Sequence, residues 1–261
     1  MLTKAGDLFR QGDLGAAIEA GNAAVKANPA DTGARLLLAE LLLFAGIFER
    51  ADSVLDAAST IDPASALVVS EFRQLLRGEM ARRQLVTDGR LPEFLGEPTT
   101  TQSHVLRALV ALRADDAATA AEAVQEAEQS RPVVAGLRDG TAFSDFRDAD
   151  DLSIGTFEVL TTTGKYFWIP TERVESIEFH PPKRPRDLFW RRCTMVVREG
   201  PDGDVYLPAL YPTDAAAGDS LRLGRATEWT EGEPVRGIGQ RLYLAGEEGV
   251  PVQQLAVLEF S

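Results

Sequence analysis

The fold of this chain is decided by one unit that occurs twice near its start. Residues 5–29 read AGDLFRQGDLGAAIEAGNAAVKANP and residues 39–63 read AELLLFAGIFERADSVLDAASTIDP, so the copies lie 34 residues apart. A third copy, ALVALRADDAATAAEAVQEAEQSRP, covers residues 108–132. All three carry alanine at the first, thirteenth and twentieth positions and proline at the last. Matches in four columns, with proline among them, indicate a genuine repeat.

A fixed period of this length is typical of stacked pairs of antiparallel helices. Gly12, Gly46 and Asp115 stand at the eighth position of the three copies, where a turn between helices is expected. The pattern is similar to the tetratricopeptide repeat, whose small-residue and proline positions it reproduces and whose large aromatic positions it lacks. We therefore expect three stacked hairpins, with residues 64–100 as an insertion or a divergent unit.

The second half of the chain follows the strand period instead. Hydrophobic residues alternate with polar ones from about Gly155, and Thr163-Gly164 and Asp202-Gly203 are hairpin turn signals. Helices first and strands later predict an α+β, two-domain fold: a helical repeat domain over residues 1–135 and a strand-rich α+β domain over residues 136–261. The expected strands are 156–162, 165–169, 174–180, 192–198, 205–207, 240–244 and 255–260.

Composition favours a soluble protein that does not bind nucleic acid or membrane non-specifically. The net charge is −13 over 261 residues, which opposes association with phosphate-rich surfaces. A single cysteine excludes an internal disulfide. The first residues lack the apolar run of a signal peptide, and no apolar stretch is long enough to span a bilayer. The expected location is the cytoplasm.

The residue types of an active site are scarce. His104 and His180 are the only histidines, and neither has metal-ligand spacing with Cys193, which sits among alternating apolar residues. The aspartates at 145, 148, 150 and 151 lack the spacing of a Ca²⁺ loop and favour a solvated loop. We therefore expect no catalytic residues, no metal and no cofactor. A carboxylate-based hydrolase in the second domain stays an alternative, with Glu172, Glu175 and Glu178 as its candidates.

A basic and aromatic segment, residues 181–192, stands out in this acidic chain. It reads PPKRPRDLFWRR. Arginine and tryptophan are favoured anchors of protein interfaces, so the segment predicts a secondary docking patch. Its residues are Lys183, Arg184, Arg186, Trp190 and Arg191. Two other interpretations are open: a nucleic-acid contact over 183–192, and a rigid loop with Trp190 in the core.

The repeats predict a groove for a partner. The first helix of each pair lines the concave face of a repeat array. Each of these helices carries one stripe at positions i, i+4, i+7 and i+8. The predicted partner-binding residues are Leu36, Glu40, Leu43, Phe44, Val105, Leu109, Leu112 and Arg113. An amphipathic helix could lie there, unless the insertion or the second domain already fills the groove.

The second half resembles a known family. The resemblance rests on the order of several long motifs: FEVLT at 157–161, GKYFWIP at 164–170, RDLFWR at 186–191, VYLPALYP at 205–212, LGRATEW at 223–229 and GQR at 239–241. Together with the N-terminal repeats they make the whole chain similar to the ImpE family, also called TagJ or SciE, accessory proteins of the bacterial type VI secretion system.

The resemblance implies a function that the residues alone do not give. It implies a non-catalytic cytoplasmic adaptor that binds a helix of the small subunit of the contractile sheath. It also implies a second partner, the ATPase that recycles the sheath. No binding motif of the family is carried over to particular residues.

Overall fold

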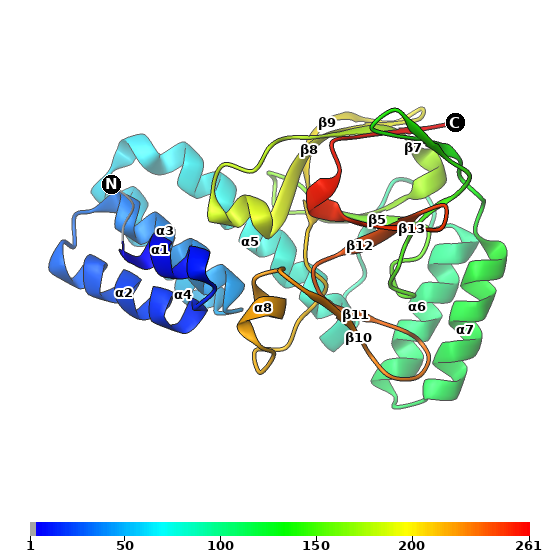
Figure 1. Ribbon diagram of the computed structural model, residues 1–261, viewed down its shortest axis with the longest axis horizontal. Coiled ribbons are helices and arrows are strands. Elements are labelled where there is room, and N and C mark those ends of the chain that lie inside the picture. The colour runs from blue at the N-terminus through cyan, green and yellow to red at the C-terminus, as the bar shows by residue number, and fades with distance from the viewer. Residues whose placement is uncertain (1–3) are drawn as a thin grey trace.

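Two helical hairpins form the N-terminal end of the molecule. The computed structural model describes residues 4–261 (Figure 1). Its first hairpin is α1 (Lys4–Gln11) and α2 (Leu14–Ala27), and its second is α3 (Thr32–Phe44) and α4 (Phe48–Ile61). Gly12 and Gly46 turn the chain with φ of 95° and 73°, a conformation that glycine adopts without strain. The carboxylates of Asp13 and Asp31 cap α2 and α3. The first two repeats are therefore confirmed as hairpins.

The third repeat also forms a hairpin, but it does not continue the stack. Between them lie η1 (Pro63–Ser65), the 22-residue helix α5 (Ala66–Thr87) and the short strand β1 (Glu93–Phe94). The third hairpin is α6 (Thr100–Arg113) and α7 (Ala117–Ser130), at the opposite end of the molecule from α1–α4 (Figure 1). The expectation of three stacked hairpins is corrected, because α5 carries the chain away from the first two.

Most strands of the second half belong to one large sheet. Nine strands run in the order β1-β6-β5-β9-β8-β7-β14-β2-β3, with β1 parallel to β6 and every other pair antiparallel. The strand-rich part of the chain also contains a three-stranded sheet, β13-β12-β4, and the pair β10-β11. The strands are β2 (Gly136–Arg138), β3 (Thr141–Phe143), β4 (Phe146–Asp148), β5 (Thr156–Leu160), β6 (Tyr166–Pro170), β7 (Val174–Phe179), β8 (Trp190–Val197), β9 (Asp202–Pro208), β10 (Thr227–Trp229), β11 (Gly237–Gly239), β12 (Leu242–Ala245), β13 (Glu248–Pro251) and β14 (Val257–Phe260).

Short helical turns join several of these strands. They are η2 (Thr171–Arg173), η3 (Pro185–Leu188), α8 (Asp219–Arg222) and η4 (Val252–Gln254).

Two local expectations about the strands are corrected by the structure. Residues 136–148, where no strand was expected, contain three strands of three residues each. Asp202 and Gly203 belong to β9, and the turn before them passes through Glu199, whose φ is 51°.

One hydrophobic core joins the helices to the sheet. Leu41 and Phe44 of α3, Leu75 of α5 and the indoles of Trp168 and Trp190 belong to the same buried cluster. A second cluster lies within the strand-rich part, around Phe146, Phe157, Tyr243 and Phe260. The α+β, two-domain class is confirmed, while the boundary at residues 135 and 136 stays a prediction. Among residues 4–261, no helix combines the length and apolarity that a bilayer crossing requires.

Candidate functional site

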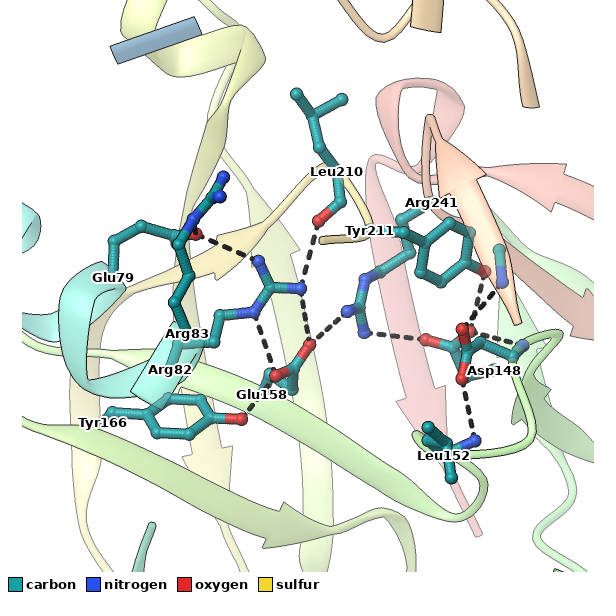
Figure 2. Close-up of polar contacts among 12 residues, drawn as sticks. Glu79, Arg82, Arg83, Asp148, Leu152, Glu158, Tyr166, Leu210, Tyr211 and Arg241 are labelled. Atoms are coloured by element: carbon teal, nitrogen blue, oxygen red, sulfur yellow. Dashed lines mark hydrogen bonds and ion pairs between the residues drawn. The ribbon is translucent and has the colours of Figure 1, made fainter. Parts of the chain in front are cut away.

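A buried network of charges joins α5 to the strand-rich part. Figure 2 shows Arg82 of α5 reaching the carboxylate of Glu158 on β5. Both contacts, from Nε and Nη2 of Arg82, measure 2.9 Å. Arg241 contacts the same carboxylate and donates to Asp148 at 2.7 Å. The exposed fractions of Arg82, Arg241 and Asp148 are 2%, 1% and 2%. The network therefore clamps the two parts together in the interior.

Neutral and charged partners around this clamp satisfy most of its remaining oxygens. Glu79 accepts hydrogen bonds from Arg82 at 3.2 Å and from the Trp190 indole at 3.1 Å. The hydroxyl of Tyr166 donates to Glu158, and that of Tyr211 donates to Asp148 at 2.8 Å. Burial opposes ionisation of Glu158, but the guanidinium groups of Arg82 and Arg241 lower its pKa to about 2. Glu158 is therefore a fixed anion and not a proton donor near neutral pH.

A cleft of about 820 Å³ opens beside the network, between α5, α6 and the segment 212–238. A cleft of this volume is large enough to enclose a drug-sized ligand or several side chains. Its walls are largely apolar, but seven charged side chains also line it. The lining includes Leu85, Val86, Thr87, Leu109, Leu152, Trp168, Pro212, Ala217, Leu221 and Ile238, with the charged side chains of Arg82, Arg83, Asp150, Glu158, Asp214, Glu228 and Arg236.

Asp150 supplies a buried carboxylate to the cleft. It is 5% exposed, and its two oxygens accept the backbone N–H groups of Leu152 at 2.7 Å and Gly237 at 2.8 Å. Burial and the nearby carboxylate of Asp148 raise its pKa to about 7. The solvated loop expected for the aspartates 145–151 is therefore corrected: Asp148 and Asp150 are buried because Arg241 and backbone N–H groups satisfy them.

The residues predicted to line a repeat groove lie mostly in the interior. Glu40, Leu43 and Phe44 are at most 5% exposed, because the segment with Arg186 and Phe189 lies across α3. Leu36, also on α3, is half-buried. On α6, Val105 and Leu109 are buried, Leu112 is half-buried, and Arg113 is exposed and donates a hydrogen bond to the Leu85 carbonyl. Of the eight residues, Leu109 lines the cleft.

The predicted basic patch divides into surface and core. Lys183 and Arg184 are exposed, whereas Arg186, Trp190 and Arg191 are 5%, 1% and 3% exposed. Arg186 stacks over the Phe72 ring at 4.8 Å, and Arg191 donates to the Val252 and Leu255 carbonyls. The interpretation of a rigid loop with Trp190 in the core therefore describes this segment. In this structure only two of the five side chains are open to a partner.

The remaining candidate residues do not assemble a reaction centre. Cys193 is fully buried, and burial raises the pKa of its thiol. Glu175 and Glu178 are exposed on β7 and Glu172 is half-buried in η2, and none of the three lines the cleft. Among residues 4–261, no three His, Cys, Asp or Glu side chains are grouped so as to hold a metal ion.

Sequence reasoning missed the cleft and the charges at its floor. Arg82 and Glu158 are 76 residues apart, so no local motif joins them. One signal was present: Glu158 interrupts the apolar run of Phe157, Val159 and Leu160, where a charge requires a buried partner.

Comparisons with known proteins agree with this architecture. The family model described as ImpE protein matches residues 140–259, and a tetratricopeptide repeat model matches residues 8–70. The type VI secretion system accessory component TagJ of Pseudomonas aeruginosa is 30% identical over 257 residues, which cover 97% of this chain and 90% of that protein. A crystal structure of a protein from Vibrio parahaemolyticus has a TM-score of 0.92 at 27% identity, covering 99% of this chain and 98% of that one. This chain belongs to the ImpE/TagJ family of type VI secretion accessory proteins.

Proposed function

We propose that this protein is a non-catalytic cytoplasmic adaptor of a type VI secretion system, and that it holds a helix of the small sheath subunit in the cleft between α5, α6 and the segment 212–238. Membership of the family supports the secretion system. The sheath subunit is the partner that the family resemblance implies, and the sheath-recycling ATPase is the second.

The cleft is the observation that carries this proposal. It is formed by helices on one side and strand-rich segments on the other, and its walls include Val86, Leu109, Trp168 and Ile238. An amphipathic helix placing two or three apolar side chains there would remove apolar surface from water on both partners. The repeat groove predicted on α3 has no comparable opening, because Phe44 packs against the Phe189 ring at a centroid distance of 5.3 Å.

The chemistry of the cleft supports binding over catalysis. Glu158 and Arg82 are held by each other and by further buried partners, so neither is free to exchange protons with a substrate. A general acid or base must reach a reacting group with a pKa near the working pH. Asp150 has such a pKa, but both of its oxygens accept backbone N–H groups, and the neighbouring carboxylate of Asp148 is bound to Arg241.

The experiment is a binding titration of the purified small sheath subunit with a cleft variant. Thr87 is exposed in the last turn of α5, lines the cleft and donates its hydroxyl to the Arg83 carbonyl. Thr87→Trp should fill the cleft and weaken binding about tenfold or more, the size of one lost anchor.

Thr60→Trp is the matched control. Thr60 is exposed in the last turn of α4 and donates to the Asp56 carbonyl in the same way, but it lies outside the cleft. Thr60→Trp should leave the affinity for the sheath subunit unchanged. Equal affinity of Thr87→Trp and the unaltered protein, or no binding of the sheath subunit at all, would refute the proposal.

Addition of the purified ATPase to the preformed complex tests the second partner by co-elution in gel filtration.

A further inference from the structure

Asp150 is a buried carboxylate without an ion-pair partner of its own, although the charge of Arg241 acts on it from a distance. Among residues 4–261 it takes part in no ion pair, and its oxygens accept only backbone N–H groups. The guanidinium of Arg241 is already held by Asp148 and Glu158. Removal of a carboxylate from water without a countercharge is costly unless another group compensates for it. The carboxylate therefore stands ready for a cation that enters the cleft.

The charges of the cleft as a whole also favour a cation. Arg82 pairs with Glu158, and Arg83 pairs with Glu79 at 3.4 Å, so these guanidinium groups are balanced. Of the other charged lining residues, Asp150, Asp214 and Glu228 are acidic and Arg236 alone is basic. Asp214, Glu228 and Arg236 are all exposed, so two carboxylates and one guanidinium lie on the solvent side of the cleft.

We propose that the cleft receives a basic side chain of the bound helix, a lysine or arginine whose aliphatic stem lies along the apolar walls and whose cationic head meets the carboxylate of Asp150. This proposal rests on the proposed function for the identity of the helix. Lysine and arginine bury their stems against apolar surface while the head finds a polar partner, which matches walls such as Leu152 and Ile238 around one carboxylate.

The cation subsite can be tested without the sheath. n-Butylguanidinium presents the stem and head of arginine, and n-butylurea is its neutral counterpart. In an NMR titration of the full-length ¹⁵N-labelled protein, n-butylguanidinium should shift the amide resonances of Leu152 and Gly237 saturably, because these N–H groups donate to Asp150. n-Butylurea should not. Equal shifts with both probes, or none at these two amides, would overturn the subsite.

Variants separate the carboxylate from general effects of charge. Asp150→Asn should lower the affinity for n-butylguanidinium about tenfold, as expected for loss of a hydrogen bond between charged groups. Asp139→Asn is the matched control, because Asp139 also accepts two backbone N–H groups, those of Ala256 and Val257, outside the cleft. If Asp150→Asn does not fold, Glu228→Gln, at an exposed residue of the cleft lining, is tested instead. Its affinity for n-butylguanidinium should fall about twofold. Unchanged affinity in the folded variant contradicts the proposal.

The pH dependence gives a second readout. The ionised form of Asp150, which also faces Asp148 and Arg241, would be favoured by a bound cation. Because its pKa is about 7 in the free protein, affinity for n-butylguanidinium should rise between about pH 6 and about pH 8 and be flat in Asp150→Asn.

A peptide of the sheath helix completes the design. Replacement of its lysines and arginines by methionine, one at a time, should cost affinity strongly at one position. If every replacement is neutral while the helix still binds, the adaptor function holds and the cation subsite is wrong. If the helix fails to bind but n-butylguanidinium saturates the cleft, the subsite holds and the proposed partner is wrong.

Discussion

Glu158 shows how much a single buried residue can hold together. Its carboxylate accepts from Arg82 of α5 and from Arg241, so it connects three segments of the chain (Figure 2). Removing one member of a buried ion pair leaves the other charge without compensation, which costs far more than the net contribution of the intact pair.

Glu158→Gln should therefore lower the free energy of unfolding by about 3–5 kcal/mol, measured by urea denaturation. Glu93→Gln is the control, because Glu93 pairs with Lys165 where both side chains are about half exposed. It should change stability by less than about 1 kcal/mol. Similar losses in the two variants would mean that the network at Glu158 is not a clamp.

Glu40 gives a stability effect that depends on pH. It is buried on α3, with Arg186 at 3.9 Å, and burial outweighs the attraction of Arg186 to raise its pKa to about 7. A carboxyl whose pKa is higher in the folded state binds more protons when folded, so its contribution to stability is present at low pH and is lost as the pH rises.

Between about pH 5 and about pH 8, the unaltered protein should lose up to about 3 kcal/mol that Glu40→Gln retains. Denaturation at several pH values, with the difference between the two proteins plotted, checks this. A difference that does not depend on pH would show that Glu40 ionises freely at its position beside Arg186. Asp150 contributes in the same direction and is common to both proteins, so it cancels in the comparison.

At the scale of elements, the segment that joins η3 to β8 covers the face of α3 that was predicted to bind a partner. Phe44 of α3 lies between Phe9, at a ring-centroid distance of 5.2 Å, and Phe189, at 5.3 Å. Leu43 and Phe44 are both buried, so replacement of either by aspartate is expected to unfold the protein.

Phe44→Ala should cost about 3–5 kcal/mol of stability, and Phe189→Ala a similar amount. The double variant should cost less than the sum, by about 0.5–1.5 kcal/mol, because the two rings contact each other edge to face. Leu67→Ala, at a side chain that is 80% exposed on α5, is the control and should be near neutral. Strict additivity of Phe44→Ala and Phe189→Ala would mean that the segment does not pack on α3.

Sequence patterns predicted the elements whose cause is local. The alanine columns of the repeats became buried helix contacts, as at Ala17, Ala51 and Ala120, each fully buried. Helices α2 and α3 begin directly after Asp13 and Asp31, whose carboxylates cap their N-termini. Strands β2 to β4 were missed because three residues are too few to show an alternation, and their pairing partners lie far along the chain.

At the scale of the whole molecule, the helical and strand-rich parts are not independent. The third hairpin touches β6 through Gln102, whose side-chain amide donates to the Trp168 carbonyl at 3.4 Å. Arg131, just after α7, pairs with Asp145 between β3 and β4. These contacts, like the cleft, depend on residues brought together by tertiary packing. A repeat pattern can predict the hairpins but not which of them stack, so the position of the cleft could not be predicted from the sequence.

A fragment of residues 1–135 tests the predicted boundary. It would keep Arg82 and Gln102 but lose Glu158 and Trp168, so we expect reduced helicity and no cooperative transition in circular dichroism, whereas the full chain should unfold in one step. The full chain at equal concentration is the reference. A fragment that unfolds cooperatively at the midpoint of the full chain would show that the helical part folds alone.

Helix α5 also sets the distance between the two ends of the molecule. Arg82 is fixed near one end of the helix, and Leu67 lies fifteen residues away at the other end, a span of about 22 Å at 1.5 Å per residue. The first two hairpins are tied to the strand-rich part as well, because the N–H of Leu14 donates to Asp219 and Phe44 packs against Phe189. The helix is therefore a strut braced at both ends, which keeps the cleft beside Arg82 at a set distance from the N-terminal hairpins.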